Sequence, residues 1–243
     1  MVKAGILDRF KIARLFALHN APNLAEGHFM TTPGPIMAAV DTFSITVAGR
    51  GGHGAMPHET ADPIVAAVGI VQAIQTISSR NVLSAQEHVI SVTQIHTGSA
   101  SNIIPEDGWF CATIRCFDPE VRALLKRRFH EIVEGHAMAY GVAAAVDYDW
   151  GYPATVNHAD EAAFAAEVAS EISGADAVEA NGAREMGSED FSYMLEARPG
   201  AYLFMGIGDG AGLHHARYNF NDEAAPVGAS FFARLVERAQ PLS

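Results

Sequence analysis

The chain has 243 residues, of which 49% are hydrophobic and 18% are charged, a composition typical of a globular protein rather than a disordered one. Its 28 acidic residues outnumber its 16 lysines and arginines, and the net charge of −12 argues against nucleic acid and anionic membranes as partners. Because no apolar stretch is long enough to span a bilayer and residues 1–11 lack a signal-peptide core, we expect a soluble, cytoplasmic protein without a membrane partner.

The first part of the chain predicts a short buried strand over 13–18, followed by a loop over 19–35 that is rich in Pro, Gly, Asn and Thr. From residue 42 to 150 the hydrophobic periods and cap signals predict six elements. They are a strand over 42–48, a helix over 63–79, strands over 88–95 and 109–117, a helix over 119–140 and a strand over 142–148. This βαββαβ order is that of a ferredoxin-like domain.

The pattern changes after residue 151. A helix over 161–172, a helix opened by Ser188, an apolar strand over 201–207 and a final helix from Pro226 are typical of an α/β domain. We therefore expect an α/β domain made of residues 1–41 and 152–243, with the ferredoxin-like domain of residues 42–151 inserted in it.

Three features of the predicted α/β domain could carry chemistry. His19 directly follows a predicted strand, where α/β sheets gather their sites, so it is either a zinc or manganese ligand or an ordinary loop histidine. His214 and His215 follow another apolar strand, and at most one of them is expected to face a site shared with His19. Glu189 follows Ser188 at a predicted helix start, where it either favours the helix dipole or lies near a metal or substrate.

The inserted domain holds its own candidates. The glycine-rich segment 49–54 lacks the Gly-Lys-Ser/Thr ending of a phosphate-binding loop, and its glycines are better suited to a tight bend that presents His53. Asn102 is a polar residue of this domain. Arg115 shares a predicted strand face with Trp109, and it either binds a carboxylate through both nitrogens or is a surface residue.

Six segments together resemble one enzyme family and occur in its order. They are residues 18–22 (LHNAP), 49–58 (GRGGHGAMPH), 98–105 (GSASNIIP), 112–115 (ATIR), 186–191 (MGSEDF) and 213–222. The chain resembles the co-catalytic metal amidohydrolases of the aminoacylase/carboxypeptidase superfamily. The nearest branch contains the hippurate hydrolases, the N-acyl-L-amino-acid amidohydrolases and the indole-acetyl-amino-acid hydrolases.

The resemblance implies a metallopeptidase-like catalytic α/β domain with an inserted ferredoxin-like lid that also dimerises, acting on small N-acyl amino acids. It implies that His19 and His214 each bind one of two divalent ions, zinc or manganese. It further implies that His53 is the catalytic lid histidine that stabilises the oxyanion, across a homodimer in many members. In the same way Asn102 and Arg115 would hold the substrate carboxylate, and Glu189 would be an active-site acid.

One departure limits what the resemblance implies. The family has a His-Ala-Cys-Gly-His-Asp motif and a Glu-Glu pair upstream of the Leu-His-Asn segment, whereas the 243 residues contain neither a Cys-x-His nor a Glu-Glu sequence. The chain therefore resembles only the C-terminal part of such an enzyme, and we expect it to be inactive alone. Two alternatives remain: one half of a split enzyme that an upstream polypeptide complements, and a non-catalytic dimerisation or binding module.

Overall fold

The computed structural model describes residues 1–240 and divides the chain into two compact units. Unit 1 contains Met1–Ala38 together with Pro153–Ser243, of which residues up to 240 are described, and unit 2 contains Ala39–Tyr152. The chain therefore enters unit 2 after Ala38 and leaves it after Tyr152. Residues 39–41 and Tyr152, which the sequence placed in the first domain, lie in unit 2.

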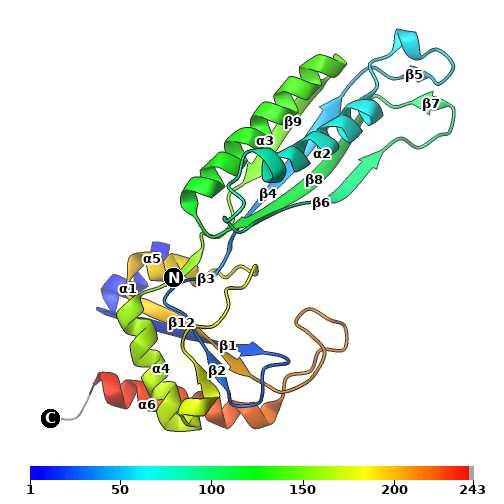
Figure 1. Cartoon of the computed structure of the whole chain (residues 1–243). Helices are drawn as coiled ribbons and strands as arrows, with labels where there is room; N and C mark the ends of the chain where they lie inside the picture. Colours follow the sequence, from blue (N-terminus) through cyan, green and yellow to red (C-terminus); the bar gives the residue numbers. More distant parts are fainter. Residues whose placement is uncertain (241–243) are drawn as a thin grey trace. The chain divides into compact units, whose positions relative to one another are not determined.

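Unit 2 contains a four-stranded antiparallel sheet in the order β6-β8-β4-β9. Its main elements are β4 (Ala39–Ala48), α2 (Pro63–Arg80), β6 (His88–Thr97), β8 (Asp107–Cys116), α3 (Pro119–Tyr140) and β9 (Ala143–Asp149). A smaller pair consists of β5 (Gly52–His53) and β7 (Ile103–Ile104), with the 3₁₀ turn η2 (Pro57–Glu59) beside it. Both long helices lie against the same face of the four-stranded sheet (Figure 1). The element order is βαββαβ, as the sequence predicted.

Local sequence explains where the two helices begin and end. The Asp62 carboxylate accepts hydrogen bonds from the backbone N–H groups of Ile64 and Val65, and Asp118 caps α3 in the same way. A proline follows each aspartate at the first helical position, where its missing N–H is not needed. Gly141 ends α3 with a φ of 68°, a left-handed conformation that glycine adopts at little cost.

The core of unit 2 lies between the helices and one face of the sheet. The side chains of Phe43, Ile45 and Val47 alternate along β4 and are fully buried, and Phe110 of β8 joins them. The Phe43 ring stacks on Phe129 of α3 with 4.0 Å between the ring centroids. The period-2 pattern of β4 therefore marks its buried face correctly, and Ser44 and Thr46 lie exposed on the opposite face of the strand.

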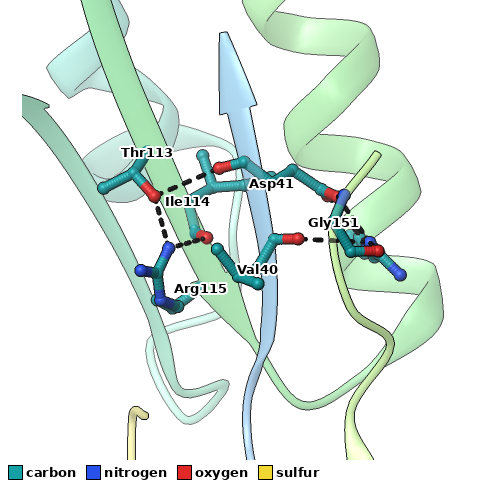
Figure 2. A network of polar contacts seen from close by, with 7 residues as sticks. Val40, Asp41, Thr113, Ile114, Arg115 and Gly151 are labelled. Atoms are coloured by element: carbon teal, nitrogen blue, oxygen red, sulfur yellow. Dashed lines mark hydrogen bonds and ion pairs between the residues drawn. The ribbon is translucent and has the colours of Figure 1, made fainter. Parts of the chain in front are cut away.

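A buried ion pair joins α3 to the start of β4. Asp41 and Arg122 have side chains that are 1% and 7% exposed, and two nitrogens of the Arg122 guanidinium donate to the two Asp41 carboxylate oxygens. Burial alone would lower the pKa of Arg122, but the hydrogen bonds and charge of Asp41 raise it. Arg122 also donates to the carbonyls of Val40 and Gly151. The Gly151 N–H donates to Asp41 (Figure 2). The network thus holds residues 40–41 and Gly151, near the points where the chain enters and leaves unit 2, against α3.

Unit 1 contains a mixed sheet in the order β1-β12-β2-β11. Its strands are β1 (Leu15–Ala21), β2 (Phe29–Met30), β11 (Val178–Glu179) and β12 (Gly200–Gly206), and a separate pair consists of β3 (Gly34–Met37) and β10 (Thr155–Asn157). The helices are α1 (Ile6–Arg9), α4 (Ala159–Ser173), α5 (Ser192–Ala197) and α6 (Ala225–Ala239), with 3₁₀ turns η1 (Val2–Ala4), η3 (Ala175–Ala177) and η4 (Asp222–Ala224). Strands β1 and β12 are parallel, so their carboxyl ends lie side by side.

Two sequence predictions for unit 1 are wrong. Residues 19–35, predicted as a loop, contain the end of β1, all of β2 and the start of β3, because short strands in a polar segment give no periodic signal. Ser188 does not open a helix: α5 begins at Ser192, and no side chain within residues 1–240 caps it. The Ser192 hydroxyl instead donates to the Glu189 carbonyl at 2.7 Å, within the turn that precedes the helix.

The side chain of Asn157 forms hydrogen bonds with the backbone of β12 that a neighbouring strand would otherwise form. It is 2% exposed, its Oδ1 accepts from the Tyr202 N–H at 2.7 Å, and its Nδ2 donates to the carbonyls of Tyr202 and Thr32 and to the Thr31 hydroxyl. Strand β2 pairs with β12 only through Phe204 and Met205, so the amide satisfies the backbone of β12 where β2 has no residue to pair with it.

Among residues 1–240, no helix is long and apolar enough to cross a membrane.

Candidate functional site

His19 lies within β1, two residues before the strand ends, and its register partner on β12 is Phe204. The imidazole packs between two rings of β12, with centroids 6.2 Å from Tyr202 and 6.1 Å from Phe204. Its Nδ1 is 2.8 Å from the Asn20 carbonyl oxygen, which leaves Nε2 for another partner. Sequence reasoning placed His19 after the strand, and the structure places it near the carboxyl end of the strand.

His214 lies in the long segment between β12 and η4. It has a φ of 62°, a left-handed conformation that is uncommon for a residue other than glycine, and its side chain is exposed. The neighbouring His215 is used locally, because its Nδ1 accepts the backbone N–H of Arg217 at 3.0 Å. Only His214 of the two therefore keeps both ring nitrogens without a hydrogen bond to residues 1–240.

A cavity of about 380 Å³ lies at the carboxyl ends of β1 and β12. Most of its lining is apolar and comes from Ala21, Pro22, Leu24, Met30, Phe204 and Leu213. Ala21 lies two residues after His19 on β1, so both side chains are on the same face of the sheet. Asn20 and Leu213, which are the chain neighbours of His19 and His214, both line the cavity. A ligand in this cavity would therefore lie beside the segments that carry both histidines.

Glu189 connects to His19 through a residue that sequence reasoning did not single out. The Tyr202 hydroxyl donates to the Glu189 Oε2 at 2.9 Å, and the Tyr202 ring is one of the two that contact His19. Burial and the charge of Glu189 raise the pKa of Tyr202, so it remains a neutral donor. A hydrogen bond with Glu189 also raises the pKa of Asp190. A tyrosine in an otherwise apolar strand was the available signal, since a buried hydroxyl needs a partner.

In unit 2 the structure brings His53 and Asn102 together. Strand β5 pairs with β7, and the backbone N–H of Gly54 donates to the Asn102 carbonyl at 2.8 Å. The glycines are needed here, because a Cβ on Gly51 would lie 2.6 Å from the carbonyl oxygen of Ile104. His53 is exposed, and its Nδ1 accepts the backbone N–H of Ala55 at 3.0 Å. The glycine-rich loop therefore bends tightly and presents His53, as expected.

Arg115 lies at the other end of the sheet in unit 2. Arg115 pairs with Val40 of β4. Asp107, at the end of β8 that is next to β7, pairs with Ala48. These two positions of β8 are eight residues apart, which corresponds to about 26 Å along a strand. The Arg115 guanidinium donates to the Thr113 hydroxyl and to the Ile114 carbonyl (Figure 2), and burial lowers its pKa. Within one copy of the chain, Asn102 and Arg115 therefore cannot contact the same carboxylate.

The described residues do not fit a complete metal site. Among residues 1–240, no group of three or more His, Cys, Asp or Glu side chains is placed to hold a metal ion. A catalytic zinc ion usually has three protein ligands and water. His19 and His214 would each be a single ligand, so no catalytic step through a metal follows from these residues.

Comparisons with known proteins agree with the family indicated by the motifs. A model of peptidase family M20/M25/M40 matches residues 1–238. The chain is 35% identical over 235 residues to a hippurate hydrolase of Campylobacter jejuni, a match that covers 97% of this chain and 61% of that protein. It is 33% identical over 235 residues to an N-acetylcysteine deacetylase of Bacillus subtilis, with 97% and 60% covered.

A solved structure shares the mixed α/β fold. A dinuclear metal binding peptidase of the M20 family from Bacillus subtilis superimposes with a TM-score of 0.79 at 27% identity, covering 98% of this chain and 60% of that one. The chain thus spans about 60% of the length of the relatives and of the solved structure that it matches.

Proposed function

Because the chain belongs to peptidase family M20/M25/M40, we propose that it takes part in hydrolysing the amide bond of N-acyl amino acids. In this proposal His19 and His214 are each one ligand of a divalent ion, zinc or manganese, which would polarise the amide carbonyl when bound. The described residues complete neither ligand set, so the chain supplies part of the active site. His53 would donate a hydrogen bond to the oxyanion, and Arg115 or Asn102 would bind the substrate carboxylate.

The cavity at the carboxyl ends of β1 and β12 carries this proposal. It is the kind of place where α/β sheets bind their ligands, and its volume of about 380 Å³ suits a small molecule. The residues next to His19 and His214 line it. The names of both relatives, a hippurate hydrolase and an N-acetylcysteine deacetylase, describe removal of an acyl group from an amino acid, which supports the substrate class.

The test measures release of free amino acid from a panel of N-acyl amino acids, hippurate included, with added manganese or zinc. We expect the 243-residue chain alone to release no amino acid above the blank, because its described residues do not complete a metal site. We expect hydrolysis when the chain is mixed with the part of the Campylobacter jejuni hippurate hydrolase that lies outside the match.

Histidine variants serve as controls for that mixture. His19→Ala and His214→Ala are expected to abolish hydrolysis, whereas His136→Ala, on α3 of unit 2, is expected to keep it. A mixture that folds and associates but hydrolyses nothing would overturn the proposed function. Hydrolysis by the chain alone, lost in both site variants, would instead show that the chain completes a metal site by itself.

We further propose that a second copy of this chain is a partner, bound through unit 2. Strand β6 is an edge of its sheet and contains no Lys, Arg, Asp, Glu or Pro, the residues that usually protect edges. The other edge, β9, carries Asp147 and Asp149. Beside β6, helix α2 exposes an apolar stripe in which Ile64, Val65 and Val68 are 37%, 52% and 46% exposed. Antiparallel pairing of two β6 edges would cover both stripes with two-fold symmetry.

Sedimentation velocity tests this partner. We expect the parent chain to sediment as a dimer and the double variant Val65→Lys/Val68→Lys to sediment as a folded monomer, because two charges would enter the apolar contact. Val236→Lys is the matched control, since Val236 is 57% exposed on α6 of unit 1. A monomeric parent, or a double variant that stays dimeric, would contradict the proposed interface.

A further inference from the structure

One charged residue lines the cavity at the carboxyl ends of β1 and β12. Among the lining residues in the described part of the chain, Glu185 alone carries a charge, and the other polar side chains are the neutral amides of Asn20 and Asn23. Sequence analysis did not single out Glu185, which directly precedes the 186–191 motif segment. Among the described residues, Glu185 is therefore the one formal charge that a ligand in this cavity would meet.

The backbone of Glu185 is held firmly at this position. Its N–H donates to the Ile36 carbonyl at 2.9 Å, and its carbonyl accepts the Ala38 N–H at 3.1 Å. These bonds form a parallel bridge between Met37, at the end of β3, and Glu185. The Glu185 side chain is exposed, and its carboxylate has no ion pair or hydrogen bond to the residues that the structure describes. The fold therefore fixes the place of this charge while leaving its oxygens available to a ligand.

The rest of the cavity suits an aliphatic chain. Met30 and Phe204 belong to the apolar cluster on the His19 face of the sheet, and Leu24 and Leu213 line the cavity with them. A volume of about 380 Å³ lies within the range of roughly 300–1,000 Å³ that is usual for small-molecule sites. Glu185 would repel an anionic ligand, whereas a cationic ligand would gain a partly solvated ion pair that a neutral ligand lacks.

We propose that this cavity binds a short aliphatic chain that ends in a protonated amine or guanidinium, with the Glu185 carboxylate as its counter-charge. If the proposed function holds, this ligand group is the side chain of an N-acylated basic amino acid. Only this identification of the ligand rests on the proposed function. Glu185 is then a specificity-determining residue. Because its side chain is exposed, the preference is modest, up to roughly five-fold in dissociation constant, as for a partly solvated ion pair.

The experiment measures binding to the intact chain without any hydrolysis. Hexylamine, 1-hexanol and hexanoate are titrated against protein with ¹³C-labelled methionine methyl groups. Met30 reports on the cavity, and Met138, which is 83% exposed on α3 of unit 2, is the internal control. We expect hexylamine to shift the Met30 signal with a dissociation constant roughly three- to five-fold below that of 1-hexanol. Hexanoate is expected to bind most weakly, and the Met138 signal is expected not to move.

Three variants separate charge from shape. Glu185→Gln is expected to make hexylamine and 1-hexanol bind equally, and Glu185→Asp is expected to keep part of the preference for the amine. Glu223→Gln removes another exposed acid of unit 1, from outside this cavity, and is expected to change nothing. Equal binding of the three probes to the parent chain, or an amine preference that survives Glu185→Gln, would overturn the proposal. Failure of the hydrolysis assay leaves this titration unaffected, so the two results are distinguishable.

Discussion

Replacing Arg122 with methionine is expected to lower the free energy of unfolding of unit 2 by about 3–5 kcal/mol, the usual effect of breaking a buried ion pair from one side. Asp41 would keep its carboxylate, 1% exposed, with the Gly151 N–H still donating to it. The carbonyls of Val40 and Gly151 would also lose a donor. Urea unfolding followed by tryptophan fluorescence measures this effect specifically, because both tryptophans, Trp109 and Trp150, lie in unit 2.

The same helix offers a matched control for this change. Arg127 of α3 has a side chain that is 62% exposed, and it pairs with Glu131 at 3.7 Å across one helical turn. Arg127→Met is expected to cost no more than about 0.5 kcal/mol. Adding Asp41→Leu to Arg122→Met is expected to recover much of the loss, because no buried charge then remains unpaired. Equal effects of Arg122→Met and Arg127→Met would show that the Asp41 network does not stabilise unit 2.

The elements that were predictable from sequence are those with local signals. Asp62-Pro63, Asp118-Pro119 and Gly141 mark helix ends through contacts within a few residues, and the structure confirms all three. The alternation of Phe43, Ile45 and Val47 marks the buried face of β4 because every second side chain of a strand points to the same face of the sheet. Ser188 gave the same kind of local signal, but the helix start predicted there is wrong, because serine hydrogen-bonds equally well within turns.

Contacts between residues far apart in the chain left no such signal. Asp41 and Arg122 are 81 positions apart, and neither residue stands out in its own segment. The candidate site shows the same limit. The motif segments correctly indicated the family, but the placement of Tyr202 between Glu189 and His19 depends on packing across β12. The register of β8, which separates Asn102 from Arg115 within one copy, also follows only from the pairing of strands.

Replacing Asn157 with leucine is expected to destabilise unit 1 by about 2–4 kcal/mol. Leucine has a similar volume but neither accepts from the Tyr202 N–H nor donates to the Thr32 carbonyl, and each unsatisfied buried group costs about 1–3 kcal/mol. Amide hydrogen exchange of β12 measures the effect within unit 1, where tryptophan is absent from the described residues. Asn181→Leu, an exposed asparagine of the same unit, is the control and is expected to change stability by less than about 0.5 kcal/mol.

Asn157→Asp adds a pH test of the same hydrogen bonds. An oxygen would replace the Nδ2 donor and would face the Thr31 hydroxyl and the carbonyls of Thr32 and Tyr202. The introduced carboxyl can donate only when it is protonated, so folding raises its pKa above the ordinary value for aspartate. A raised pKa in the folded state means that the variant is relatively more stable at low pH and loses that stability as the pH rises through the folded-state pKa. We therefore expect a smaller deficit against the parent chain at pH 4 than at pH 8. A deficit that does not change between these pH values would show that the Nδ2 hydrogen bonds contribute little to the stability of unit 1.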